Sequence, residues 1–161
     1  MRGDEAFTAL WEREHDRLHR ALSLTLGDRD LASEAVDEAF ARAYARWPQV
    51  QRLDDPAGWI YRVAVNWATS WLRKRRLRPT RPIEELDRAV RDQVDDRLAD
   101  AGLSTAVGRL PIAQRSAVVL RFYLDWPVDR IATSLGVPPG TVKSRLHRAL
   151  GALRAQVEVQ G

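Results

Sequence analysis

Apolar residues recur at steps of three and four over most of this chain, which is the spacing of one face of an α-helix. The first stretch carries such a face in these residues: Phe7, Leu10, Trp11, Leu18, Leu22 and Leu26. The pair Gly27-Asp28 interrupts the pattern, and the same spacing resumes from about Arg29. The period therefore predicts an all-α fold, divided by glycine and proline at a few positions.

The breaks in this pattern predict where the helices end. A second helix is expected from about Arg29 to Pro48, with one face turned inward: Leu31, Ala35, Val36, Ala39, Phe40 and Tyr44. Two prolines and Asp54-Asp55 predict a loop over residues 47–58, followed by a third helix that ends near Arg76. Later helices are expected at residues 105–110, 112–124, 128–135 and 139–157.

Residues 77–103 differ from both flanks, because they hold seven acidic residues, five arginines, two prolines and no aromatic residue. This composition predicts a flexible charged linker. We therefore expect two small helical domains, a three-helix bundle over residues 1–76 and a helix-turn-helix domain over residues 105–161, joined by a linker at 77–104.

The composition disfavours several classes of protein. There is no cysteine and there are three histidines, His15, His19 and His147, so disulfides, thiolate catalysis and an all-histidine metal site are not expected. No apolar run approaches the ~18 residues of a membrane span. The N-terminus is acidic where a secretory signal is basic and then apolar. We expect a cytoplasmic protein without membrane insertion and without a fused regulatory domain beyond Gly161.

The charges are arranged in blocks. The formal net charge is +4, from 26 basic and 22 acidic residues. Residues 27–55 carry four bases and seven acids, residues 56–83 carry seven bases and no acid, and residues 109–161 carry eight bases and three acids. Alternating blocks indicate several charged partners rather than one uniform polyanion.

The most specific motif is the segment from Asp129 to Arg148, DRIATSLGVPPGTVKSRLHR. A short amphipathic helix ends at Gly136, which supplies a left-handed turn, and Pro138-Pro139 starts a second helix in a new direction. This order predicts a helix-turn-helix, whose second helix enters the major groove of DNA.

The second helix of this motif has two distinct faces. Apolar residues gather on one face: Val142, Leu146, Ala149, Leu150 and Leu153. The other face is polar, with two bases on its flanks: Thr141, Ser144, His147 and Arg148, flanked by Lys143 and Arg145. Hydroxyls at the helix start and arginines beside them suit contacts to phosphates and guanines. The pattern favours DNA binding over an ordinary solvated face.

The helix that precedes the linker also has a polar stripe. Its inward face is predicted to hold Ile60, Val63, Ala64, Trp67 and Trp71. The opposite stripe is polar and basic and contains no acid: Arg62, Asn66, Thr69 and Arg73. A basic helix end alone is usually just solvated. A whole stripe of this kind predicts a second nucleic-acid face.

In the order of its parts, the chain resembles bacterial RNA polymerase sigma factors of the extracytoplasmic-function (ECF) group, in the sigma-70 family. The resemblance rests on motifs spread over almost the whole sequence: Asp30, Ala35, Asp37, Phe40 and Ala43; Pro56-Ala-Gly-Trp-Ile60 with Ala64 and Asn66; Leu110-Pro111, Gln114-Arg115 and Val119-Leu120-Arg121; and Gly140-Thr-Val-Lys-Ser-Arg-Leu-His-Arg-Ala149. Such factors keep two promoter-reading domains, called regions 2 and 4. The predicted bundle and the helix-turn-helix domain would correspond to them.

The resemblance implies a role for each group of polar residues. An acidic helix would dock on the clamp helices of the largest polymerase subunit through Asp30, Glu34, Asp37, Glu38 and Arg42. The −10 element would be recognised and opened, with a flipped base held in the loop, by Trp47, Asp54, Asp55, Trp59, Arg62, Asn66, Thr69 and Arg73. The −35 element would be read by Thr141, Lys143, Ser144, Arg145, His147 and Arg148.

The resemblance also implies which partners to expect. The protein would be a transcription initiation factor and not an enzyme, with core RNA polymerase (clamp helices and flap region), promoter DNA and an anti-sigma factor as partners. It implies no cofactor, no metal and no small-molecule substrate. The acidic linker would thread polymerase channels that nucleic acid otherwise occupies.

The chain departs from the family pattern at several positions. Val65 stands where many members have arginine, Ser70 where aspartate is usual, and Arg130 where glutamate is usual. Trp67 and Trp71 replace commoner aliphatic residues. These changes are compatible with the family, but they leave the promoter sequence that the protein recognises undetermined.

Three other interpretations compete with this one. Glu12-x-x-His15, with Glu34 and Glu38 on another helix, has the spacing of carboxylate-bridged metal bundles, but a second Glu-x-x-His motif is absent. A stand-alone helix-turn-helix regulator would explain the C-terminal half, but not the acidic helix or the second basic face. An accessory polymerase-binding protein would not need the groove-facing residues of the last helix.

Overall fold

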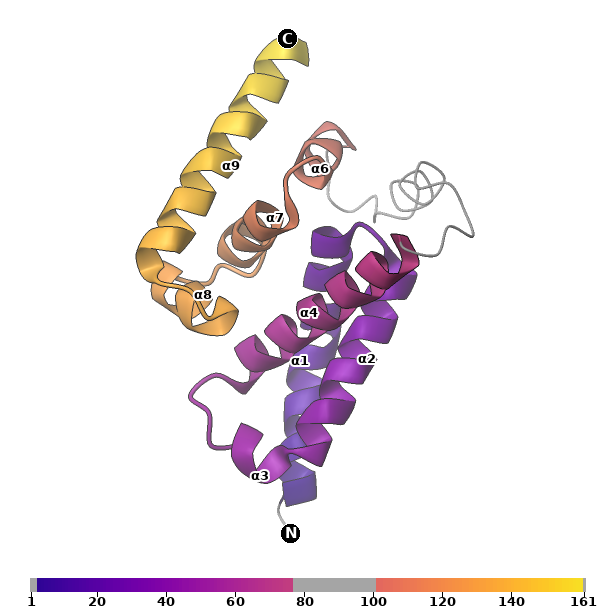
Figure 1. Ribbon diagram of the computed structural model, residues 1–161. Helices are drawn as coiled ribbons and strands as arrows, with labels where there is room; N and C mark the ends of the chain where they lie inside the picture. Colours follow the sequence, from indigo (N-terminus) through magenta and orange to yellow (C-terminus); the bar gives the residue numbers. More distant parts are fainter. Residues whose placement is uncertain (1–2, 77–100, 161) are drawn as a thin grey trace.

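The computed structural model describes residues 3–76 and 101–160, which form helices joined by short turns (Figure 1). The helices run in the order α1 (Gly3–Leu26), α2 (Arg29–Ala45), α3 (Trp47–Val50), α4 (Pro56–Arg76), α6 (Ala101–Gly108), α7 (Ile112–Val118), the π-helical turn η1 (Val119–Tyr123), α8 (Val128–Leu135) and α9 (Pro139–Gln160). The described residues contain no strand, so the all-α prediction is confirmed. Most of the predicted linker lies outside the described residues, and α6 begins earlier than the helix expected at Thr105.

The first domain is a bundle of α1, α2 and α4 (Figure 1). A tight turn joins α1 to α2: Gly27 has a φ of 69°, and the Asp28 carboxylate accepts a hydrogen bond of 3.0 Å from the Leu31 N–H. This N-cap begins α2 directly after the turn. Each helix then buries one apolar face, and the bundle core includes Leu10, Leu18, Ala21, Leu22, Ala32, Ala35, Val36, Ala39, Phe40, Ile60 and Ala64.

The end of α2 differs from the prediction in two ways. Tyr44 was expected inside, but its side chain is exposed, packs edge-on against Phe7 and donates a hydrogen bond of 3.2 Å to the Asp4 carboxylate. The predicted burial is wrong because, at this end of the bundle, Tyr44 lies against the first turns of α1 at the surface and not inside the core. Pro48 was expected to end the helix and to lie in a loop over residues 47–58. The helix does end just before Pro48, but the loop prediction is wrong at both ends: Pro48 lies in the first turn of α3, where its missing N–H needs no partner, and α4 already begins at Pro56.

The second domain contains the predicted helix-turn-helix, formed by α8 and α9. At the end of α8, Gly136 has a φ of 68° and its N–H donates to the Thr133 carbonyl (3.3 Å). The next N–H, of Val137, donates to the Ala132 carbonyl (3.0 Å). These two bonds form a Schellman motif, so the left-handed turn predicted at Gly136 is confirmed. The chain then reverses direction and α9 begins at Pro139.

The inner face of α9 agrees with the prediction at all but one residue. The buried residues are Val142, Leu146, Ala149 and Leu153. Leu150 was also expected inside, but it is exposed. This part of the prediction is wrong because α6, α7 and α8 cover only one side of α9, and Leu150 lies beyond the edge of that side.

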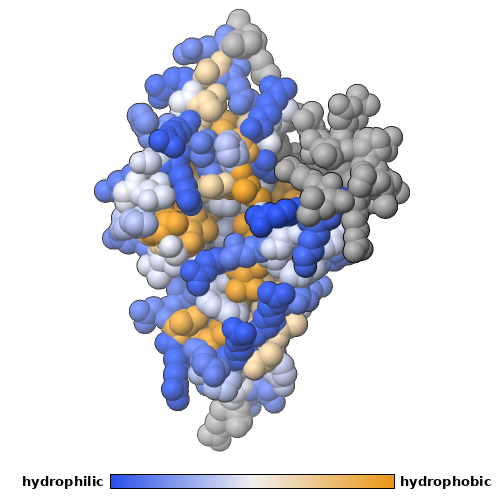
Figure 2. Space-filling view, viewed as in Figure 1, coloured by the Kyte–Doolittle hydropathy of each residue, from blue (hydrophilic) through white to orange (hydrophobic). Residues whose placement is uncertain are grey.

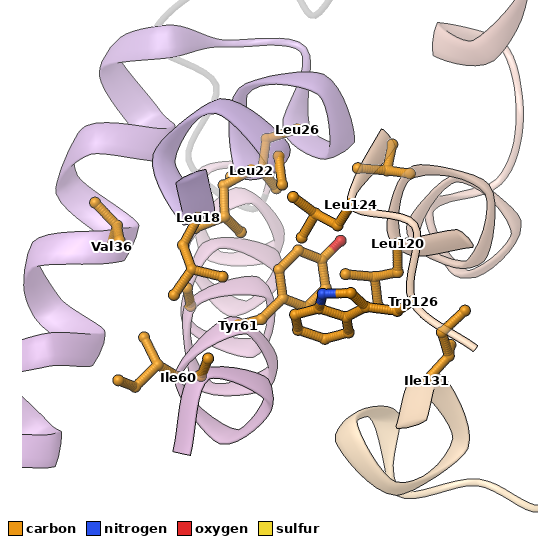
Figure 3. Packing of buried hydrophobic residues seen from close by; sticks show 14 of the residues in the cluster. Leu18, Leu22, Leu26, Val36, Ile60, Tyr61, Leu120, Leu124, Trp126 and Ile131 are labelled. Atoms are coloured by element: carbon orange, nitrogen blue, oxygen red, sulfur yellow. The ribbon is translucent and has the colours of Figure 1, made fainter. Parts of the chain in front are cut away.

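The two domains pack directly against each other (Figure 3). Tyr61, on the side of α4 that faces the second domain, is fully buried. It lies among apolar side chains from both domains: Leu22 and Leu26 of α1, and Leu120, Leu124 and Trp126 of the second domain. Beside this contact, Arg115 Nη1 donates a hydrogen bond of 2.8 Å to the Thr25 carbonyl. The buried apolar residues of the two domains therefore form one continuous core.

The buried face of α4 is consequently rotated from the predicted one. Val63, Trp67 and Trp71 were expected inside, but they are only half-buried. The fully covered residues are Ala57, Ile60, Tyr61, Ala64 and Ala68. The prediction assumed a single partner surface, whereas α1 and α2 cover one side of α4 and α8 covers another.

The Tyr61 hydroxyl is hydrogen-bonded inside this core. It lies 2.7 Å from Thr25 Oγ1, and since that hydroxyl donates its own proton to the Ala21 carbonyl (2.9 Å), Tyr61 is the donor. Burial raises the pKa of Tyr61 to about 12, while the neighbouring hydroxyls of Thr25 and Ser116 and the charge of Arg115 oppose the increase. The folded protein therefore requires the neutral phenol.

Tyr61→Phe is expected to lower the free energy of unfolding by about 1 kcal/mol, the net value of one buried hydrogen bond. The variant also tests the alkaline behaviour. Unfolded Tyr61 loses its proton near pH 10 and folded Tyr61 near pH 12, so its contribution is complete below pH 10 and declines as the pH rises toward 12. Denaturant titrations of both proteins will show their stability difference narrowing above pH 10. A difference that stays constant contradicts this assignment.

Candidate nucleic-acid interface

The outer side of α9 carries all the residues predicted to read the −35 element. Lys143, Ser144, His147 and Arg148 are exposed, and Thr141 and Arg145 are half-buried at the flanks. Within residues 3–76 and 101–160, no acidic side chain pairs with the lysine or the two arginines of this face. The buried residues of α9 point into the domain, so the opposite side is a free basic surface on the helix that follows the turn.

The polar stripe of α4 is less accessible than that of α9. Asn66 and Arg73 are exposed, whereas Arg62 and Thr69 are half-buried. Thr69 Oγ1 donates to the Val65 carbonyl of its own helix (2.7 Å). The Arg62 guanidinium lies against the turn of the helix-turn-helix, where a Cβ at Gly136 would come within 2.5 Å of Arg62 Nη1. One end of the stripe therefore touches the second domain.

Asp55 connects the first domain to the second. Its Oδ1 accepts a hydrogen bond of 3.1 Å from the Gly58 N–H, so it caps the start of α4. The same carboxylate receives two bonds from Arg130 of α8, Nε to Oδ2 at 2.9 Å and Nη2 to Oδ1 at 3.1 Å. Ser134 Oγ adds a third contact at 3.3 Å. Asp55 was predicted to hold a flipped base, and in this structure its oxygens are engaged by the second domain.

The other residues predicted around the −10 loop are not all together. Asp54 is exposed and Trp59 is half-buried near the start of α4. Trp47 lies apart from them, buried edge-on against Phe7 with a ring separation of 5.5 Å. Its Nε1 is buried and has no hydrogen-bond partner among the described residues. The structure thus gathers the predicted −10 residues along α4 and its start, with Trp47 as the exception.

The predicted polymerase-binding residues share one outer face of α2. Asp30, Glu34, Asp37 and Arg42 are exposed, and Glu38 is half-buried. Two of the acids already have partners: Arg42 Nε donates to Glu38 Oε1 (3.1 Å), and His15 Nε2 lies 3.1 Å from Asp37 Oδ1. The His15 ring stacks on Trp11 at 4.1 Å. The acidic face of α2 is therefore bordered by an aromatic edge of α1.

Sequence reasoning missed the residues that join the two domains. Arg130 and Ser134 hold Asp55, and Tyr61, Thr25 and Ser116 surround the buried hydroxyl. One signal was present, namely the arginine at position 130 where the family pattern has glutamate. It could have suggested an acidic partner, but nothing in the sequence identifies Asp55 as that partner.

Residues 3–76 and 101–160 contain neither a metal-binding cluster nor a membrane-spanning helix. Among the described residues, no group of three or more histidine, aspartate or glutamate side chains is placed so that it could hold a metal ion. Glu12 and His15 therefore do not belong to such a group. None of the described helices is long and apolar enough to cross a membrane. The surface in Figure 2 is largely hydrophilic, with apolar side chains in separate patches.

Comparison with known proteins gives matches over both domains. The family model for sigma-70 region 2 matches residues 10–78, and that for sigma-70, region 4 matches residues 101–153. The chain is 39% identical over 132 residues to the RNA polymerase sigma-E factor of Streptomyces antibioticus, covering 80% of this chain and 72% of that protein. It is 34% identical over 152 residues to the ECF RNA polymerase sigma factor SigM of Mycobacterium tuberculosis, covering 92% and 75%.

A solved structure has the same fold over both domains. The sigma factor RpoE in complex with the anti-sigma factor NepR, from Bartonella quintana, aligns with a TM-score of 0.71 at 22% identity, covering 98% of this chain and 99% of that one. The two family models match the two domains described above, and the relatives match across both. The chain therefore belongs to the sigma-70 family and is an RNA polymerase sigma factor of the ECF group.

Proposed function

We propose that this protein initiates transcription by binding core RNA polymerase, directing it to promoters with −10 and −35 elements, and opening the duplex at the −10 element. The observation that carries the proposal is the basic outer side of α9, which has no acidic partner among the described residues and follows a complete helix-turn-helix. Family membership supports the same role. As a factor that acts on chromosomal promoters, it would work in the cytoplasm without catalysing a reaction of its own.

For the −35 element, we assign base reading and phosphate binding to different residues of α9. Arg148 is exposed well into the helix, where an arginine can reach the edge of a guanine. Thr141, Lys143, Ser144 and Arg145 lie nearer the start of the helix. Lys143 and Arg145 are on the flanks of this face, where the strands of DNA would pass, so we assign Lys143 to phosphate. His147 is exposed between Arg148 and Leu146 and belongs to the same face.

For the −10 element, the accessible part of the surface is the middle and end of α4. Asn66 and Arg73 are exposed there, and both are free to meet a nucleic-acid strand. Asp54, Asp55, Trp59 and Arg62 form the other end, near the second domain. We propose that this end completes the −10 surface once the second domain has moved.

The acidic face of α2 is proposed to dock on the clamp helices of the largest polymerase subunit, with the second domain reaching the flap region. Its carboxylates would otherwise repel DNA, so a basic protein partner accounts for their presence beside two basic faces. An anti-sigma factor is a further proposed partner, supported by the solved sigma factor of similar fold that is bound to one.

The rival is a helix-turn-helix regulator that binds DNA alone. Run-off transcription on candidate promoters with purified core polymerase distinguishes the two. The sigma factor should yield transcripts of defined start only together with core enzyme, and the free protein should bind promoter duplex weakly and without sequence preference. Tight, sequence-specific gel shifts by the free chain, without promoter-dependent transcription, would favour the regulator.

Substitutions on α9 should separate base reading from phosphate binding. Arg148→Ala is expected to cost about 1–3 kcal/mol and to change the preferred −35 sequence, whereas Lys143→Ala should weaken all promoters alike and reduce the salt slope by about one. The measurement is transcription from a library in which both promoter elements are randomised. If Arg148→Ala lowers transcription from all promoters uniformly, Arg148 contacts phosphate and does not read a base.

Asn66→Ala provides the matched test on the other face. Because Asn66 is exposed on α4, its loss should alter selection at the −10 element while leaving −35 preference as in wild type. The same promoter library measures both preferences at once. A changed −35 preference in this variant contradicts the assignment of the two faces to separate elements.

Charge reversal on α2 tests the polymerase surface. Changing Asp37 and Glu38 together to lysine should weaken binding to core polymerase, because it replaces attraction to a basic partner by repulsion. We expect a loss of affinity of about ten-fold or more, which corresponds to about 1.4 kcal/mol or more. The fold should persist because neither side chain is part of the core. A pull-down with core polymerase measures the loss. The control reverses Glu5 and Glu12, two exposed acids of α1, and should bind as wild type does; retention of full binding by the α2 variant removes the assignment.

A further inference from the structure

Three groups, Asp55, Arg130 and Ser134, form what we call the interdomain latch. They join the start of α4 to the first helix of the helix-turn-helix. The same two domains bury Tyr61 between them (Figure 3). Asp55 and the neighbouring Arg62 are also residues assigned above to the −10 surface. The second domain and a DNA strand therefore require the same groups.

We propose that the latch holds the free protein in a closed, autoinhibited state, in which the second domain competes with single-stranded −10 DNA for Asp55 and Arg62. The inference rests on the proposed function only in taking these two residues as contacts of DNA. Closure leaves the outer side of α9 exposed. The inhibition is therefore directed at the −10 surface and at the simultaneous use of both promoter elements.

The geometry of the latch is that of a specific ion pair rather than a chance surface contact. Arg130 meets the Asp55 carboxylate with two nitrogens, at 2.9 and 3.1 Å, in the forked arrangement that makes arginine–carboxylate pairs strong. The guanidinium also lies over the Trp126 ring, 3.7 Å from its centroid. The side chains of Arg130 and Asp55 are 36% and 19% exposed, so the pair is partly shielded from water.

At the latch, the backbone of each domain lies directly against side chains of the other, which leaves no room for a DNA strand between them. A side-chain carbon at Gly58 would clash with Ser134 Oγ, and one at Gly136 would press on the Arg62 guanidinium. The Asp55 carboxylate is held in place by its cap to the Gly58 N–H, so it presents a fixed target to Arg130. A base could reach Asp55 only after α8 has withdrawn.

The residue at position 130 decides whether its interaction with Asp55 is attractive or repulsive. A glutamate at this position would place two carboxylates together beside Asp55 and favour separation of the domains. Arginine reverses this interaction. The apolar core around Tyr61 packs the two domains together, and the latch sets how strongly the edge of this contact at Asp55 stays closed.

Interdomain distance in the full chain tests the closed state without any DNA. The sequence has no cysteine, so cysteines introduced at exposed Ser33 of α2 and Ala155 of α9 can carry a fluorescent donor and acceptor. Arg130→Gln and Asp55→Asn should each raise the open fraction about ten-fold, and the double variant little more than either alone. Asparagine still caps α4, so the cap is retained.

The second domain offers a matched control for this cycle. Arg121 pairs with Asp125 at 3.7 Å and lies over the Phe122 ring at 5.7 Å, an arginine with the same two kinds of contact but within one domain. Arg121→Gln should leave the energy transfer unchanged. In the unsubstituted protein, salt should lower the transfer because a partly exposed ion pair is screened. Unchanged transfer in Arg130→Gln and at high salt overturns the latch.

Binding of single-stranded DNA tests the competition. The probe is a pool of single strands of randomised sequence, with no polymerase present. Arg130→Gln removes a positive charge, so electrostatics alone predicts weaker binding, as expected for Arg121→Gln. Release of the −10 surface should instead raise affinity several-fold in Arg130→Gln. If the domains separate in Arg130→Gln but its affinity for single-stranded DNA does not rise, the proposed competition with DNA is wrong. Failure of run-off transcription by the wild-type protein would count separately, against the proposed function.

Discussion

The burial of Tyr61 between the two domains is the contact on which the arrangement of this protein depends. The ring lies among leucines of α1 and residues of the second domain, and its hydroxyl donates to Thr25 Oγ1 inside the core. A buried phenol without that partner would cost free energy, so the contact favours one relative placement of the domains. Because α4 carries both Tyr61 and the polar stripe, this placement also decides how much of the stripe is exposed.

That placement makes the two predicted DNA surfaces unequal. The outer side of α9 points away from the first domain and none of its bases is paired with an acid of the described residues. On α4, by contrast, Arg62 lies against the turn at Gly136 and Asp55 is bound by Arg130. One surface is ready to meet DNA and the other is partly occupied. The same chain can therefore fold with its −35 surface presented and its −10 surface restrained.

Charge patterning acts at two scales in this molecule. Over tens of residues, acidic and basic blocks separate an acidic α2 from the basic faces of α4 and α9. Over a few ångströms, individual charges are matched across elements, as Asp37 is with His15 and Asp55 with Arg130. The long-range pattern suits large charged partners, whereas the local pairs hold the protein's own surfaces together.

The sequence by itself determined most of the helices, the Gly136 turn, the inner face of α9 apart from Leu150, and the family, because each depends on local spacing or on a motif within one segment. Only the tertiary structure decided that α4 turns Tyr61 rather than Trp67 into the core, that Tyr44 is exposed, and that Arg130 reaches Asp55. Helical periodicity reports one apolar face per helix. It cannot report a second face made by a domain that lies far along the chain, since such a contact depends on shape complementarity between surfaces that form only after each domain has folded.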